Sequence, residues 1–156
     1  MEIERKYLIT KEKIPFEPEH YPCRHIEQGY LCTDPVVRIR RDNDDYILTY
    51  KSKGLMIREE YNLPLNKDAY EHLKEKVDGR LIIKDRYVIP LEHISGSELK
   101  IELDFFAGDL TGLILAEVEF PDEASANTFC PPDWFGEDVT CSSEYHNSTL
   151  SRKRIL

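Results

Sequence analysis

Apolar and polar residues alternate along most of this chain, with the period of two that a β-strand gives to its two faces. The alternation predicts strands at residues 2–8, 23–31, 36–41, 45–53, 56–65, 81–90, 99–106 and 113–120. Short polar turns, such as residues 42–44 and 95–97, separate several of these strands. Consecutive strands joined by short turns favour an antiparallel sheet.

Helical spacing is confined to a few segments. Asn66 is a plausible N-cap for a helix that would end near Gly79. Its apolar stripe is formed by Tyr70, Leu73 and Val77. A shorter helix is expected over residues 122–129, and the tail from residue 138 to 156 is expected to be a short helix or a frayed end.

Many of the predicted strands carry charged residues on one face, and the charges are sorted by sign. Basic residues form the pairs Arg38 and Arg40, Lys51 and Lys53, and Lys84 and Arg86. Acidic residues form the pairs Glu2 and Glu4, Glu102 and Asp104, and Glu117 and Glu119. A solvent-exposed sheet face would explain the charged residues of any single strand. Like charges two positions apart repel, however, so a merely solvated face would normally mix the signs.

Closing this sheet into a barrel would turn the charged faces inward. We therefore predict an α+β, mainly β fold, an eight-stranded antiparallel closed tunnel with a charged lumen and a few helices packed outside. A basic wall suits a chain of phosphates. An acidic wall suits Mg²⁺ or Mn²⁺ ions that bridge those phosphates. The first strand combines both features, because Glu2, Glu4 and Lys6 share one face.

Composition narrows the class of protein. The 156 residues are expected to form one domain, 1–156, and the net charge of −9 argues against a nucleic-acid partner. With neither a membrane-length apolar stretch nor an export signal, we expect a cytoplasmic protein with no membrane partner. The cysteines are isolated in sequence, which favours reduced structural thiols over a zinc site. They are Cys23, Cys32, Cys130 and Cys141.

The ordered set of charged pairs, beginning with Glu2-x-Glu4-x-Lys6 and ending with Glu117-x-Glu119, resembles the CYTH superfamily, also called triphosphate tunnel metalloenzymes. Tyr145-x-Asn147 resembles a further feature of that family. The resemblance implies a tunnel that binds a small-molecule triphosphate together with divalent metal. It implies metal-dependent hydrolysis of the triphosphate, with inorganic tripolyphosphate as the first expectation.

Roles for individual residues follow from the resemblance and from the charge pattern. The expected metal ligands are Glu2, Glu4, Glu102, Asp104, Glu117 and Glu119. The expected phosphate-binding residues are Lys6, Arg38, Arg40, Lys51, Lys53, Arg58, Lys84 and Arg86. The expected catalytic residues are Lys6, Glu60 and Glu119, where either glutamate could orient the attacking water. An alternative for Glu60 is a plain salt bridge.

The sequence leaves several different functions open. A class IV-type adenylate cyclase would hold the same triphosphate but needs a purine pocket, for which no motif is visible. A thiamine triphosphatase would need ring-stacking residues, and Trp134 and Phe135 are candidates, although an aromatic in such a loop is more often part of a core. A non-catalytic polyphosphate or nucleotide binding protein and a scaffold barrel are the non-enzyme alternatives. The protein is expected to be a monomer or a homodimer.

Overall fold

The computed structural model describes residues 2–92 and 98–152. The turn predicted at residues 95–97 and the last four residues of the predicted tail lie outside this range. Within the described residues, no helix combines the length and the apolar character needed to cross a membrane.

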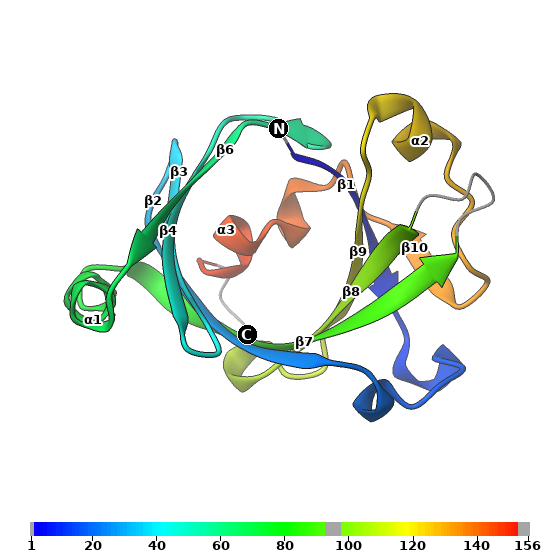
Figure 1. The fold of residues 1–156 in the computed structure, drawn as a ribbon, viewed down its shortest axis with the longest axis horizontal. Coiled ribbons are helices and arrows are strands. Elements are labelled where there is room, and N and C mark those ends of the chain that lie inside the picture. The colour runs from blue at the N-terminus through cyan, green and yellow to red at the C-terminus, as the bar shows by residue number, and fades with distance from the viewer. Residues whose placement is uncertain (1, 93–97, 153–156) are drawn as a thin grey trace.

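Antiparallel strands form an almost closed ring (Figure 1). The strands are β1 (Glu2–Ile9), β2 (Cys23–Thr33), β3 (Val36–Asp42), β4 (Asp45–Lys51), β5 (Ile57–Arg58), β6 (Glu60–Leu65), β7 (Asp78–Glu92), β8 (Glu98–Phe106), β9 (Ile114–Glu119) and β10 (Phe135–Asp138). Their order is β10-β1-β9-β8-β7-β2-β3-β4-β6, and β5 pairs with β1. The predicted fold class, a mainly β antiparallel tunnel, is confirmed. The strand expected at 56–65 is divided in two at Glu59, and β10 was not predicted.

The ring closes at one edge of β1, which two short strands share. Near its start, the Glu4 amide donates to Met56 O at 3.2 Å, beside the β5 pairing. Further along, the Val139 amide donates to Lys6 O at 2.9 Å, beside the β10 pairing. Residues two apart in a strand direct their backbone groups to the same edge. Strands β5 and β10 therefore seal the same side of β1, opposite β9.

The main apolar core lies outside the ring. Tyr7, Leu103 and Val118 are fully buried on the outer faces of β1, β8 and β9. Helix α2 (Glu123–Thr128) and the aromatic residues that follow it cover this face. Trp134 packs edge-on against Phe135, with ring centroids 4.7 Å apart. Burying the apolar side outward leaves the charged side of the same strands to face the lumen.

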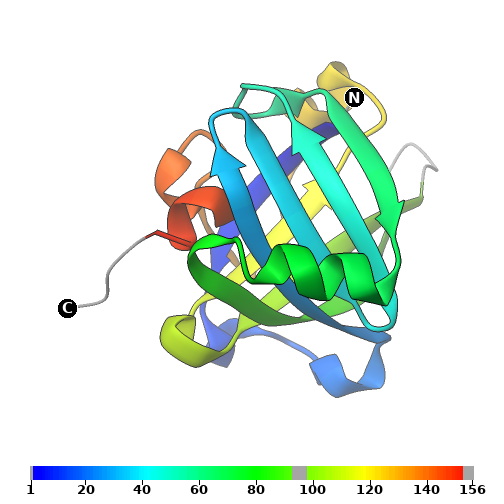
Figure 2. The same ribbon diagram turned by 90° about the vertical axis from the view of Figure 1, so that its left-hand side faces the viewer.

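Helix α1 (Lys67–Lys74) lies across the outer face of β3 and β4 (Figure 2). The predicted N-cap is confirmed, because Asn66 Oδ1 accepts from the Ala69 amide at 2.7 Å. The predicted end near Gly79 is wrong, because β7 already begins at Asp78. Gly79 instead has a φ of +67° and sits so close to the C-terminal segment that a Cβ there would lie 2.4 Å from Ser151 O.

The C-terminal segment folds back over one end of the barrel (Figures 1 and 2). It contains the 3₁₀ turn η4 (Ser143–Tyr145) and the short helix α3 (Asn147–Leu150). The backbone amide of Arg80 donates to Ser151 O at 2.8 Å and fixes this segment to β7. Three further 3₁₀ turns lie in the connections, at η1 (Lys11–Lys13), η2 (Pro18–His20) and η3 (Gly108–Leu110).

Candidate active site

The ring encloses a polar cavity to which most of its strands contribute. The predicted site residues that line it are Glu2, Glu4, Lys6, Arg38, Arg40, Lys51, Arg58, Glu60, Arg86, Glu102 and Glu117. Its lining also includes Tyr30, Val36, His146, Asn147 and Ser148. The period of two in the sequence therefore brings most of the predicted side chains into one space.

Four predicted residues lie elsewhere. The Lys53 side chain is 89% exposed and lies 3.8 Å from Asp34 Oδ1, because β4 ends at Lys51 and the strand period does not extend further. Lys84 and Asp104 are buried next to the cavity rather than on its surface. Glu119 lines a second hollow that shares Glu2, Arg40, Glu60, Arg86 and Glu102 with the cavity. That hollow is an open mouth of the tunnel.

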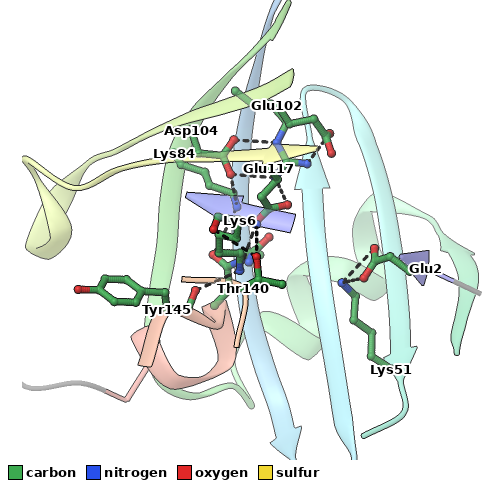
Figure 3. A network of polar contacts seen from close by, with 12 residues as sticks. Glu2, Lys6, Lys51, Lys84, Glu102, Asp104, Glu117, Thr140 and Tyr145 are labelled. Atoms are coloured by element: carbon green, nitrogen blue, oxygen red, sulfur yellow. Dashed lines mark hydrogen bonds and ion pairs between the residues drawn. The ribbon is translucent and has the colours of Figure 1, made fainter. Parts of the chain in front are cut away.

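A buried ionic network joins the acidic and basic sides of the lumen (Figure 3). Arg86 donates from Nε and Nη2 to the two oxygens of Asp104, at 2.7 and 2.8 Å, and from Nη1 to Glu102 at 2.8 Å. Lys84 Nζ lies 2.8 Å from Asp104 Oδ2. Both oxygens of Asp104 are thus occupied by cations of β7.

Lys6 and Glu117 continue this network. Their side chains lie 3.4 Å apart, and Lys6 Nζ also donates to Tyr145 O at 3.1 Å. Burial alone would raise the pKa of Glu117, but Lys6, Arg86 and Lys84 together hold it well below its usual value. Burial alone would lower the pKa of Lys6, but Glu117 and Glu4 raise it. Both groups are therefore charged at neutral pH.

Glu4 has the most unfavourable surroundings of the lumen carboxylates. Burial and the charges of Glu117 and Glu2 raise its pKa to about 8, against weaker opposition from Lys6 and Lys51. Carboxylates forced together in this way fit a hard divalent cation, which takes oxygen ligands and would relieve their repulsion. The donor set of Glu2, Glu4 and Glu117 therefore fits Mg²⁺ or Mn²⁺.

Glu2 on β1 and Glu60 on β6 lie in contact where the ring closes. Lys51 Nζ lies 3.0 Å from Glu2 Oε1. Burial raises the pKa of Glu2, and contact with Glu60 raises it further. For Glu60, burial is outweighed by its hydrogen bond with Glu2 and by the charges of Lys51 and Arg38, so its pKa is lowered. The contact between the two carboxyl groups therefore shifts their pKa values in opposite directions, up for Glu2 and down for Glu60.

The opposite wall presents the guanidinium groups of Arg38 and Arg40. Arg38 donates from Nη2 to Thr49 Oγ1 at 3.2 Å, but its buried Nε has no hydrogen-bond partner in the part of the chain that the structure describes. Arg40 donates from Nε to Gln28 Oε1 at 2.8 Å. Among the described residues, neither arginine forms a salt bridge. Burial and the charges of Arg38 and Arg86 lower the pKa of Arg40 to about 9, so an anion in the lumen would be strongly favoured.

The C-terminal segment supplies lumen residues that the charge pattern missed. Asn147 Oδ1 accepts from Lys84 Nζ at 3.3 Å. Burial, followed by the charges of Lys6 and Arg58, lowers the pKa of His146 to about 4 and keeps the ring neutral at pH 7. This segment has no strand alternation, and the Tyr145-x-Asn147 pattern was its one signal. Tyr30 could have been found from the strand period together with the strand pairing, because it lies directly opposite Arg38 in the register of β2 and β3.

Comparison with known proteins places this site in a family. Residues 1–151 match the CYTH domain family. The chain is 39% identical over 153 residues to an inorganic triphosphatase of Nitrosomonas europaea, covering 96% of each chain. It is 35% identical over 154 residues to an inorganic triphosphatase of Acetivibrio thermocellus, covering 96% of this chain and 92% of the relative.

A solved structure agrees with these sequence relatives. The crystal structure of an inorganic triphosphatase superimposes with a TM-score of 0.70 at 36% identity, and the match covers 99% of this chain and 96% of that chain. The match to the family extends over nearly the whole chain and includes every strand that lines the lumen. This chain therefore belongs to the CYTH domain family.

Proposed function

We propose that this protein is a divalent-metal-dependent triphosphatase and that its substrate is inorganic tripolyphosphate. The observation that carries the proposal is the arginine wall, Arg38 and Arg40, which forms no salt bridge among the described residues and faces the crowded carboxylates around Glu4. One wall needs an anion and the other needs a cation. A polyphosphate with bound metal satisfies both at once.

The basic residues of the lumen hold the phosphates. Arg38 and Arg40 supply forked donors, and Lys51 and Arg58 add positive charge near the seam. Lys6 stands on the acidic side, 3.4 Å from Glu117, where it meets a phosphate that lies close to the carboxylates. Lys84 and Arg86 act mainly through Asp104, whose two oxygens they occupy, although Arg86 also reaches the cavity surface.

The carboxylates of the acidic wall provide the metal ligands. Glu2, Glu4 and Glu117 are the main candidates, with Glu102 and the mouth residue Glu119 beside them. Asp104 takes a supporting role instead, because its oxygens already bind Arg86 and Lys84. When bound, Mg²⁺ or Mn²⁺ supplies charge neutralisation on the phosphate oxygens.

Glu60 is the better candidate to orient the attacking water. It lines the lumen and its pKa is lowered, whereas burial and the charges of Glu102 and Glu60 raise the pKa of Glu119. The water oxygen bonds to the terminal phosphorus as the phosphoanhydride bond breaks. Glu60 accepts the proton of the water, and the arginine wall stabilises the charge that develops on the pyrophosphate leaving group.

The choice of tripolyphosphate rests on the lining of the lumen. Among the described residues that line the lumen, Tyr30 and His146 are the two with a ring. Trp134 and Phe135, the residues considered for thiamine, pack against the outer core instead. A base or a thiamine ring therefore has little aromatic surface to stack on.

The free thiols of the four cysteines suit a cytoplasmic enzyme.

A substrate panel tests the proposal. Phosphate release is measured from tripolyphosphate, ATP, thiamine triphosphate and pyrophosphate, each with Mg²⁺ and with Mn²⁺. The proposal expects tripolyphosphate to give the highest kcat/KM. Faster turnover of ATP or thiamine triphosphate would assign a different substrate, and metal-dependent binding without turnover would make the protein a polyphosphate-binding protein.

A further inference from the structure

A second group of potential metal ligands lies on the outer wall of the barrel. Cys23 and His25 are two positions apart on β2, so they share a face. Asp85 on β7 is directly opposite His25 in the strand register. Cross-strand neighbours of this kind have their Cβ atoms about 5 Å apart. A sulfur, an imidazole nitrogen and a carboxylate oxygen, all within 4.8 Å of one another, therefore meet on one patch.

Hydrogen bonds hold His25 and Asp85 in place on this patch. The His25 amide donates to Asn43 Oδ1 at 2.9 Å, and His25 O accepts from the Asn43 amide at 2.9 Å. The imidazole Nδ1 lies 2.5 Å from Asp85 Oδ1. The His25 side chain is 76% exposed and that of Asp85 is 48% exposed, so an ion in solution can reach both. His25 and Asp85 are thus both positioned and accessible, and the Cys23 thiol beside them is partly exposed.

The mixture of donors selects the class of ion. Thiolate and imidazole are ligands of Zn²⁺ and related transition metals, and a carboxylate is acceptable to them. Mg²⁺ prefers oxygen ligands alone, which the lumen provides. The patch is therefore chemically distinct from the tunnel, and the strand period places it on the opposite face of the same strands.

Two simpler roles suit the patch less well than metal binding. A Cys-His-Asp group can activate a nucleophilic thiolate, which requires a lowered thiol pKa. Without a cation nearby, burial and the charge of Asp85 raise the pKa of Cys23 instead. A bound metal ion opposes both effects, because it deprotonates a thiol that coordinates it. The second role is a plain ion pair between His25 and Asp85. An ion pair does not account for the position of the Cys23 thiol beside these two side chains.

We propose that Cys23, His25 and Asp85 bind one Zn²⁺ ion on the outer wall, with water completing its coordination. The ion would connect β2 to β7. The neighbours of these ligands along β2 and β7 are Arg24, Lys84 and Arg86. The site would therefore stabilise the two strands that carry these cations. Spacing in the sequence could not reveal the group, because its third ligand comes from a distant strand.

Zinc titration against a chromophoric chelator, in excess Mg²⁺ to occupy the lumen, tests this site. The wild-type protein is expected to bind one Zn²⁺ per chain. Cys23→Ser and Asp85→Asn are each expected to weaken that binding by at least about tenfold. Co²⁺ gives a second signal, a thiolate charge-transfer absorption that the wild type shows and Cys23→Ser lacks.

Two matched variants locate the ion. Cys130→Ser removes an exposed thiol elsewhere, and Glu4→Gln removes a lumen carboxylate. Both are expected to keep the zinc site, and zinc is expected to raise the Tm of both but not of Cys23→Ser. The proposal is overturned if the wild type binds no zinc, or if Glu4→Gln loses the binding while Cys23→Ser keeps it.

Discussion

Asp104 accepts two hydrogen bonds from the guanidinium of Arg86, at 2.7 and 2.8 Å, with both side chains almost wholly buried. Lys84 lies 2.8 Å from the same carboxylate. One anion thus holds two cations of β7 in place beside the lumen. Removing one partner of such a cluster leaves buried charge uncompensated.

Asp104→Asn is therefore expected to destabilise the fold by about 3 kcal/mol, because Lys84 and Arg86 lose their shared anion. Urea unfolding measures the change. Asp42→Asn is the matched control, since Asp42 pairs with Arg24 at 2.7 Å where the Arg24 side chain is 38% exposed. That variant should lose no more than about 1 kcal/mol. Equal losses in the two variants would contradict the importance of burial here.

The arginine wall, Arg38 and Arg40, predicts that a substitution there lowers activity without lowering stability. Arg40→Gln removes a buried cation that is repelled by Arg38 and Arg86. Tripolyphosphate turnover should fall by about 100-fold, because a phosphate contact of the transition state is lost. The Tm should stay the same or rise. Lys53→Gln, outside the tunnel, should change neither quantity, and a large fall in the Tm of Arg40→Gln would show that Arg40 is structural.

The seam between β1 and β10 predicts a pH-dependent contribution to stability. Asp138 pairs with Arg5, and its Oδ1 accepts from the Thr140 amide at 2.9 Å. Burial alone would raise the pKa of Asp138, but its bonds to Thr140 and Arg5 lower it below 3.8. A group with a lowered pKa stabilises the fold fully above its unfolded value, and the contribution is lost as the pH falls through the folded value.

Asp138→Asn should accordingly cost about 1–2 kcal/mol of unfolding free energy at pH 7. The difference from wild type should shrink as the pH drops below 3.8. Unfolding curves at a series of pH values measure it, with the neighbouring exposed Glu137→Gln as the control. A difference that stays constant with pH would exclude the ionised carboxylate as its source.

Gly136 allows β10 to approach β1. A Cβ at this position would lie 2.6 Å from the carbonyl oxygen of Leu8. Since a backbone atom cannot move aside cheaply, Gly136→Ala should destabilise the protein by about 1–3 kcal/mol. Gly108→Ala is a control with open space around its Cβ, although its φ of +62° adds some strain of its own. Thermal unfolding compares the two, and an unchanged Tm in Gly136→Ala would mean that the seam can relax.

Much of the lumen could be predicted from the sequence, because a strand has a strict period of two. Glu2, Glu4 and Lys6 reach one space for that reason, as do Arg38 and Arg40. The prediction for Lys53 failed because the end of β4 is set by its pairing with β3 and β6, and that pairing stops at Lys51.

Features that depend on strand register or on irregular backbone could not be predicted. Strand β10 has only four residues, and its pairing relies on a glycine. His146 reaches the lumen from a tail without alternation. Cys23 and Asp85 meet only because β2 pairs with β7 in one particular register.

The most direct test of the central claim is the rate of phosphate release from tripolyphosphate by wild type and by Glu4→Gln, with Mg²⁺ or Mn²⁺ and with a chelator. Glu4→Gln keeps the size of the side chain but removes the charge that a metal would bind. We expect metal-dependent turnover by the wild type and a fall of about 100-fold in the variant. Equal turnover by both proteins, or turnover that persists in the chelator, would contradict a metal-dependent triphosphatase in this tunnel.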